Sequence, residues 1–282
     1  MQRDDQKYKA VVFDLDGTAL NSESELSVQD RVSLTELRKK NIIRIAATGR
    51  SVFSFEKIAD QTFPIDYLIY SCGSGIISWP EKKQIFSTLM QGESMHSAIS
   101  VLKDEKLCFQ VHEAIPNNHR FHSFIRPEHK IPEDYIRRCR LYKDHIISEN
   151  MPVSSLRNCN HIIAITDRED PELVDRIKKR LPALNIIRAT SPLDHRSMWI
   201  EIYPENISKG TALKKLAEQL NICTETETVA VGNDYNDLDF LNIAARSYMV
   251  SNAPENLKKL FEELPSNNEN PITALCIKQF SL

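Results

Sequence analysis

Several signals that would place a chain in a special class are missing from this sequence. Its six cysteines form no C-x-x-C pair, which argues against both a zinc site and a disulfide framework, so we expect reduced and mostly buried thiols. There is no long apolar run and no compositional bias, with 41% hydrophobic and 27% charged residues, which excludes disorder and membrane insertion. The residues before the first predicted strand are polar and show no signal-like segment, so we expect a cytoplasmic location.

A large excess of charge of either sign is also lacking. Thirty-six basic and 39 acidic residues leave a formal net charge of -3, which provides no bulk attraction to nucleic acid or to anionic lipid. We therefore expect neither a nucleic acid nor a membrane as partner. A small molecule is the simpler expectation, and the sequence does not indicate the oligomeric state.

The two ends of the chain show alternating strand and helix patterns. Apolar runs at 8–13, 42–47, 67–71, 228–231 and 248–250 are separated by helical periodicity, which is typical of βαβ units. The pattern predicts an α/β fold with a mainly parallel sheet, built from residues 1–83 and 189–282. Between these segments a hairpin at 76–88 leads into strands and helices of a separate pattern, so residues 84–188 are predicted to form an inserted α/β domain.

The segment Asp14-Leu15-Asp16-Gly17-Thr18 directly follows the first predicted strand. Ligands of open α/β sheets bind beyond the carboxyl ends of the strands. Two neighbouring carboxylates are relieved of their repulsion by a divalent cation, and hard oxygen ligands suit magnesium. Asp14 can then attack phosphorus, and Asp16 is placed to protonate the leaving oxygen and later to deprotonate water. The alternative, a calcium loop, requires more oxygen ligands at fixed spacing and no preceding apolar strand.

Three further polar segments stand at predicted strand ends or helix starts. In Ser208-Lys209-Gly210, Lys209 can neutralise charge shared by the nucleophile and the phosphoryl group. In Thr48-Gly49-Arg50, a hydroxyl and free N–H groups suit a phosphate oxygen. Each segment alone is also compatible with an ordinary turn or a surface lysine, but four in order favour catalysis. They are Thr48-Gly49-Arg50, Ser208-Lys209-Gly210 and Gly232-Asn233-Asp234-Tyr235-Asn236-Asp237.

In order and spacing, these four segments resemble the four motifs of the haloacid dehalogenase superfamily of phosphatases, specifically its type IIB, Cof-like members. Residues 71–76, 199–202 and 251–254 add to the resemblance, which covers the whole core, whereas the middle of the chain matches mainly by position and length. The resemblance implies a Rossmann-like core with an inserted α/β cap of type C2B, whose residues set substrate specificity. It also implies a Mg²⁺-dependent phosphatase that acts on a small phosphorylated metabolite, such as a sugar phosphate, through an aspartyl phosphate on Asp14.

The resemblance also assigns roles to individual positions. The family's fourth motif has Asp where this chain has Asn233, and an amide oxygen binds a hard cation without contributing charge, so metal affinity is expected to fall unless Asp234 or Asp237 compensates. A phosphomutase and a non-catalytic phosphometabolite-binding protein are the alternative functions. The expected residues are Asp14, Asp16, Thr48 and Lys209 for catalysis; Leu15, Gly17, Thr48, Gly49, Arg50 and Lys209 at the phosphate; and Asp14, the Asp16 main-chain oxygen, Asn233 and Asp237 at the metal, with Asp234 as an alternative ligand.

Overall fold

The computed structural model describes residues 7–126, 130–167, 170–191, 193–194 and 196–282. The chain divides into two compact units, the first made of Met1–Phe86 with Ser208–Leu282 and the second of Ser87–Ile207. The second unit is therefore an insertion in the first. Within the described ranges, no helix combines the length and the hydropathy that crossing a membrane requires.

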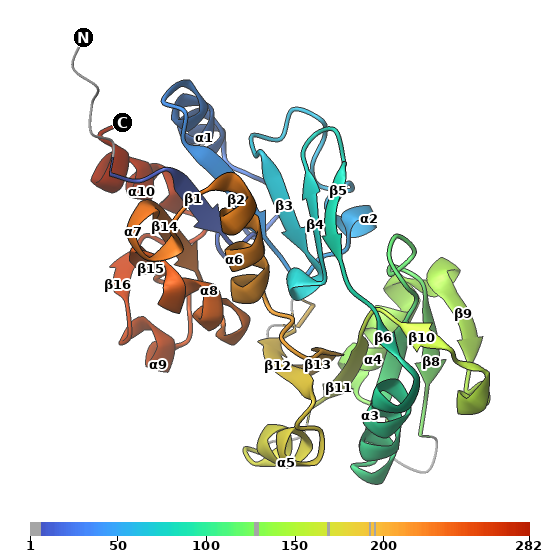
Figure 1. Cartoon of the computed structure of the whole chain (residues 1–282). Helices are drawn as coiled ribbons and strands as arrows, with labels where there is room; N and C mark the ends of the chain where they lie inside the picture. Colours follow the sequence, from blue (N-terminus) through green and yellow to red (C-terminus); the bar gives the residue numbers. More distant parts are fainter. Residues whose placement is uncertain (1–6, 127–129, 168–169, 192, 195) are drawn as a thin grey trace. The chain divides into compact units, whose positions relative to one another are not determined.

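The first unit is built on an eight-stranded sheet (Figure 1). Neighbouring strands run parallel from β16 to β3, and β4 is antiparallel to β3. The order of the strands reverses at β1, which is where open α/β sheets bind ligands. In spatial order the strands are β16 (Glu262–Leu264), β15 (Arg246–Val250), β14 (Thr228–Gly232), β1 (Ala10–Phe13), β2 (Ile43–Ala47), β3 (Tyr67–Tyr70), β4 (Gly75–Ser78) and β5 (Gln84–Ser87).

Helices cover both faces of this sheet. Successive strand residues point to opposite faces, and in β1 Ala10 and Val12 share a core with Leu213 while Val11 and Phe13 are fully buried as well. Figure 1 shows α6 and α8 on one side, and α1, which contacts β2 and α10, covers the other. The predicted α/β fold class is thus confirmed. The helical elements are α1 (Val28–Lys39), α2 (Val52–Phe55), α6 (Lys209–Leu220), α7 (Thr224–Glu227), α8 (Leu238–Ile243), α9 (Glu255–Lys258), α10 (Pro271–Phe280), and the 3₁₀ turns η1 (Ser71–Gly73) and η4 (Tyr235–Asp237).

The register of three strands decides where the polar segments lie. Phe13 at the end of β1 stands opposite Val231 of β14 on one side and Ala46 of β2 on the other. Because these strands are parallel, the segments that follow them leave the same edge of the sheet. Residues about two hundred positions apart in the chain are neighbours there.

The second unit has its own mixed sheet and core. Helices α3 and α5 pack on one face through residues such as Leu102 and Ile177, while Tyr135 of α4 packs with Ile163 and Trp199 in another cluster. The six-stranded sheet has the order β12 (Leu184–Thr190), β13 (Met198–Pro204), β11 (Ile162–Thr166), β7 (Cys108–His112), β8 (Phe121–Phe124) and β9 (Ile146–Glu149), beside a two-stranded pair of β10 (Asn158–Cys159) and β6 (Met90–Gln91). The helical elements are α3 (Gly92–Asp104), α4 (Glu133–Leu141), α5 (Leu173–Arg180), η2 (Lys143–His145) and η3 (Val153–Ser155).

The chain returns to the first unit later than the predicted position 189. That position lies inside β12, and β13 is hydrogen-bonded to both β12 and β11. Ile200 and Ile202 of β13 are buried in the core of the second unit, so the strand cannot belong to the first sheet. Residues 189–190 of β12 and 198–204 of β13, which the sequence pattern assigned to the catalytic core, therefore pair within the inserted unit.

Candidate active site

The turn after β1 carries the first polar segment. The Asp14 N–H donates to the Val231 carbonyl at 3.1 Å, and the Asp14 carbonyl accepts from the Ala19 N–H at 3.3 Å. Gly17 has a left-handed φ of 80°, and a Cβ added to it would lie 2.3 Å from Asn233 Nδ2. Gly17 is therefore needed for both its backbone angle and its lack of a side chain. Leu15 has a fully buried side chain, and its carbonyl accepts from Leu20 N at 2.9 Å, so it shapes the turn.

Lys209 joins this turn to the end of the fourth segment. It is the first residue of α6, after the N-cap Ser208, whose side chain accepts from Thr211 N in a capping box. The Lys209 Nζ donates to Asp14 Oδ1 and to Asp237 Oδ1, each at 2.7 Å, and its side chain is only 1% exposed. Three of the four polar segments thus converge on one buried ammonium group.

The electrostatics of this triad follow from burial and charge. Burial raises the pKa of Asp14 to about 8; the Lys209 charge opposes this rise, and the carboxylates of Asp237 and Asp16 add to it. Burial acts to lower the pKa of Lys209, but its two carboxylate partners outweigh it, so that pKa lies well above its ordinary value. Lys209 is therefore charged at neutral pH, while Asp14 lacks enough positive charge around it to ionise readily.

Arg50 holds the side chain of Asp16. The guanidinium donates through Nε to Asp16 Oδ2 at 2.8 Å and through Nη2 to Oδ1 at 2.6 Å. This two-point contact fixes the orientation of the carboxylate. The loop of Arg50 is closed by its own N–H, which donates to Thr48 Oγ1 at 3.1 Å.

The loop after β2 is also fixed from the other side. Thr48 is fully buried, its carbonyl accepts from Cys72 N at 3.0 Å, and the Arg50 carbonyl accepts from Ser71 N at 2.9 Å. A Cβ added to Gly49 would lie 3.4 Å from Cys72 Sγ, so the η1 turn lies directly against this loop. The second polar segment is thus positioned by β3 and η1 as well as by its own strand.

The three candidate metal ligands of the fourth segment have different surroundings. Asp237 is fully buried, and besides Lys209 it accepts from the N–H groups of Asn233 at 2.8 Å and Asp234 at 3.0 Å. Both of its oxygens are therefore engaged in holding the loop. Asp234 Oδ1 accepts from Tyr235 N at 2.8 Å, whereas Asn233 Oδ1 accepts from the Thr18 hydroxyl at 3.2 Å and so faces the first segment.

The chemistry of the site fits a hard divalent cation. Three carboxylates, those of Asp14, Asp16 and Asp237, lie against only two cations, Lys209 and Arg50. The donors around Asp14 are oxygen atoms, which magnesium prefers. Across the described part of the chain, no group of three or more His, Cys, Asp or Glu side chains is arranged to hold a metal ion, so a cation here would depend on amide and main-chain oxygens as well.

Comparison with known proteins decides the family. Residues 11–274 match the family model described as haloacid dehalogenase-like hydrolase. This chain belongs to that family. The resemblance to type IIB, Cof-like phosphatases is confirmed, and the chain is an enzyme of the phosphatase class.

Relatives and solved structures match this haloacid dehalogenase-like hydrolase over nearly its whole length. The phosphatase YwpJ of Bacillus subtilis is 25% identical over 93% of this chain and 95% of its own. The 5-amino-6-(5-phospho-D-ribitylamino)uracil phosphatase YwtE of Bacillus subtilis is 25% identical over 94% and 95%. Among structures, BT1666 from Bacteroides thetaiotaomicron has a TM-score of 0.78 at 15% identity over 100% of this chain and 98% of that one. The subclass IIB sugar phosphatase BT4131 has a TM-score of 0.74 at 18% identity over 97% and 99%.

Two residues of this haloacid dehalogenase-like hydrolase contribute to the site without having been predicted. Cys72 is fully buried beside Gly49, and its N–H holds the Thr48 carbonyl. Asp239 accepts from the N–H of Gly210, next to Lys209, at 2.7 Å. The only sequence signal for Asp239 is its place two residues after Asp237, and the only one for Cys72 is its place within residues 71–76, which add to the family resemblance.

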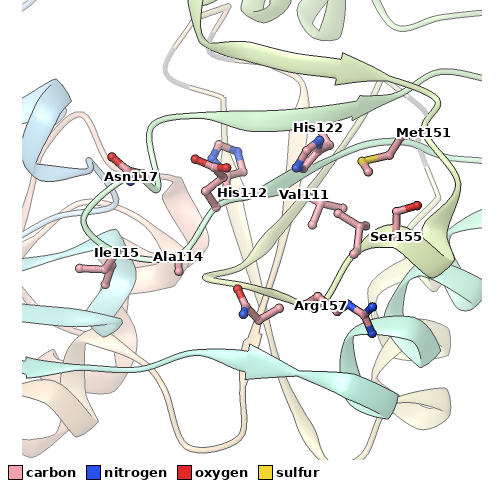
Figure 2. A pocket seen from close by; sticks show the side chains of 12 residues that line it. Val111, His112, Ala114, Ile115, Asn117, His122, Met151, Ser155 and Arg157 are labelled. Carbon is pink, nitrogen blue, oxygen red and sulfur yellow. The ribbon is translucent and has the colours of Figure 1, made fainter.

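The second unit contains a cavity of its own (Figure 2). It has a volume of about 360 Å³ and mixes apolar side chains with polar ones that can exchange hydrogen bonds. His122 on β8 lies beside it, with its Nδ1 2.8 Å from the Ser148 hydroxyl, and burial lowers the pKa of this imidazole. The lining residues are Val111, His112, Glu113, Ala114, Ile115, Asn117, His122, Met151, Ser155, Leu156, Arg157 and Asn158.

Proposed function

We propose that this enzyme is a magnesium-dependent phosphatase that hydrolyses a small phosphorylated metabolite, a sugar phosphate in our first choice, through an aspartyl phosphate on Asp14. The observation that carries the proposal is the Lys209 ammonium held between Asp14 and Asp237 at 2.7 Å from each. A charged lysine beside a buried carboxylate provides the positive charge that a phosphoryl group needs when it is transferred to that carboxylate.

The reaction has two steps. In the first, an Asp14 carboxylate oxygen forms a bond to phosphorus, the bond from phosphorus to the ester oxygen breaks, and that oxygen takes a proton from Asp16. In the second, Asp16 takes a proton from water, the water oxygen bonds to phosphorus, and the bond to Asp14 breaks, which releases inorganic phosphate. Arg50 keeps Asp16 oriented toward the phosphoryl group, and Lys209 balances the charge on Asp14 throughout.

A Mg²⁺ ion would be held by the Asp14 carboxylate, the Asp16 main-chain oxygen and Asn233. When bound, it would supply positive charge to the phosphoryl oxygens and lower the pKa of Asp14 into the range where the carboxylate is ionised. Asp237 supports these ligands through the backbone N–H groups of Asn233 and Asp234 instead of binding the ion itself, because its two oxygens already accept from three donors. Thr48 and the N–H groups after it would contact the phosphate.

The substrate class is supported by the relatives and by the second unit. Their names specify a sugar phosphatase and a phosphoribitylaminouracil phosphatase, both of which act on small metabolites. We assign the choice of leaving group to the inserted unit, whose polar and apolar cavity has a size suited to such a molecule. A cytoplasmic location, where such metabolites occur, remains part of this prediction.

The test is phosphate release from an aryl phosphate and from a panel of sugar phosphates, with and without Mg²⁺. Asp14→Asn is the blank, and Asp175→Asn, at an exposed aspartate on α5, is the matched control. We expect Mg²⁺-dependent turnover in the wild type and in Asp175→Asn but none in Asp14→Asn. Full activity of Asp14→Asn would remove the nucleophile assignment. An isomerised product with little free phosphate would identify a mutase, and tight binding of metabolite phosphates without turnover would identify a binding protein.

A further inference from the structure

Asp239 lies between the first turns of two helices. Its Oδ2 accepts from Gly210 N of α6 at 2.7 Å, and its Oδ1 accepts from Phe240 N of α8 at 2.8 Å. One side chain thus ties together the starts of α6 and α8, two helices that contact each other.

This contact matters because the first N–H groups of a helix have no partner within the helix. At the start of α6, Ser208 accepts from Thr211 N and leaves the N–H of Gly210 to Asp239. A carboxylate is also favoured at this position by the positive end of the helix dipole. The approach is so close that a Cβ added to Gly210 would lie 2.8 Å from the Asp239 carbonyl carbon, so only glycine fits there.

The residue between Ser208 and Gly210 is Lys209, and it is held at both ends. Asp237 binds its ammonium group, and Asp239, two residues further on, binds the backbone N–H that follows it. A displacement of ~1 Å at a reacting group can lower a rate by about 10²-fold. We propose that Asp239 is a positioning residue, which fixes the first turn of α6 so that the Lys209 ammonium reaches Asp14. This role rests on the proposed phosphatase function.

The kinetic test compares Asp239→Ala with a control that removes a helix cap elsewhere. Ser27 caps α1 by accepting from Asp30 N at 3.0 Å, and Ser27→Ala should cost a similar ~1 kcal/mol of stability without touching the site. At a temperature well below both unfolding transitions, we expect Asp239→Ala to lower kcat by about 10- to 100-fold with KM changed by less than about threefold. We expect Ser27→Ala to keep both constants. Equal kcat values for the two variants would show that Asp239 is only a helix cap and would overturn the proposal.

A crystal structure of Asp239→Ala separates this proposal from the proposed function. We expect the Lys209 Nζ to have left hydrogen-bonding distance of Asp14 Oδ1, and an unchanged 2.7 Å contact would refute the positioning role. If the wild type releases no phosphate from any substrate, the phosphatase function fails, and the crystal structure alone decides on Asp239. If Asp239→Ala does not fold, Asp239→Asn replaces it in both the kinetic and the crystallographic experiment, because it keeps the side-chain size and one acceptor oxygen and loses the charge. An unchanged kcat and an unchanged contact between Lys209 and Asp14 in that variant would count against the proposal.

Discussion

Replacing Asp14 by Asn should abolish turnover and, at neutral pH, make the protein more stable. In the unfolded chain this carboxyl ionises near its ordinary pKa of 3.8, whereas in the folded site burial raises its pKa to about 8. Because the folded pKa is the higher one, the folded protein holds this proton more tightly than the unfolded chain does. The stability that the bound proton provides is therefore present at acid pH and is lost as pH rises from about 4 to 8. Each pH unit in that window costs ~1.4 kcal/mol, so at pH 7 the cost reaches ~4 kcal/mol as an upper bound.

Asn has nearly the same shape as Asp, keeps an oxygen for Lys209 and carries no titrating group. For a protein of this size, ~1 kcal/mol shifts the unfolding temperature by about 2–4 °C, so Asp14→Asn should raise it by several degrees at pH 7. Thermal unfolding in EDTA from pH 4.5 to 8 measures the difference between wild type and variant. The difference should grow with pH and fall to ~1 kcal/mol at the acid end. A variant that is less stable at every pH, or a difference that does not depend on pH, would refute this account of Asp14.

Three further changes test other parts of the structure. Lys209→Met should abolish turnover and destabilise the protein by about 3–5 kcal/mol in urea unfolding, because it removes the buried cation that Asp14 and Asp237 share. Asn233→Asp should tighten Mg²⁺ binding by about tenfold in calorimetric titration, since it adds a charge beside the proposed ion; unchanged affinity would exclude Asn233 as a ligand. Burial, assisted by Arg138, lowers the pKa of His161 to about 3 from its ordinary 6.5, so only the unfolded chain gains this proton as pH falls below 6.5. Between pH 7 and pH 5, the free energy of unfolding measured in urea should therefore fall by ~2 kcal/mol less in His161→Gln than in the wild type. An identical fall in both proteins would contradict this.

Local patterns of the sequence were sufficient to predict most of the first unit. The strand before Asp14 and the helix that starts after Ser208 follow from hydrophobic periodicity and capping residues, which act between near neighbours. The convergence of distant segments was predictable because parallel strands send their carboxyl ends to one edge. The family resemblance then supplied the roles.

What the sequence could not predict depends on contacts between distant residues. β13 has the same apolar alternation as a core strand, and only its pairing with β11 and β12 places it in the inserted unit. The Arg50 to Asp16 contact and the buried position of Cys72 are equally matters of tertiary packing. For Asp239, an acid in the first turn of its own helix is common enough to attract no attention, and its bond to Gly210 exists only because α6 and α8 are neighbours.

The pairing of β1 with β14 has a consequence for how the protein is made. Asp14 and Asn233 belong to segments whose contacts span 215 positions, with the whole second unit synthesised between them. On the ribosome, the side of β1 that pairs with β14 therefore remains an open sheet edge until the chain has grown past β14, and Asp14 lacks its lysine until residue 209 has been made. The contiguous second unit has all its strands available earlier, so the portion made in the middle can become ordered before the portion made first.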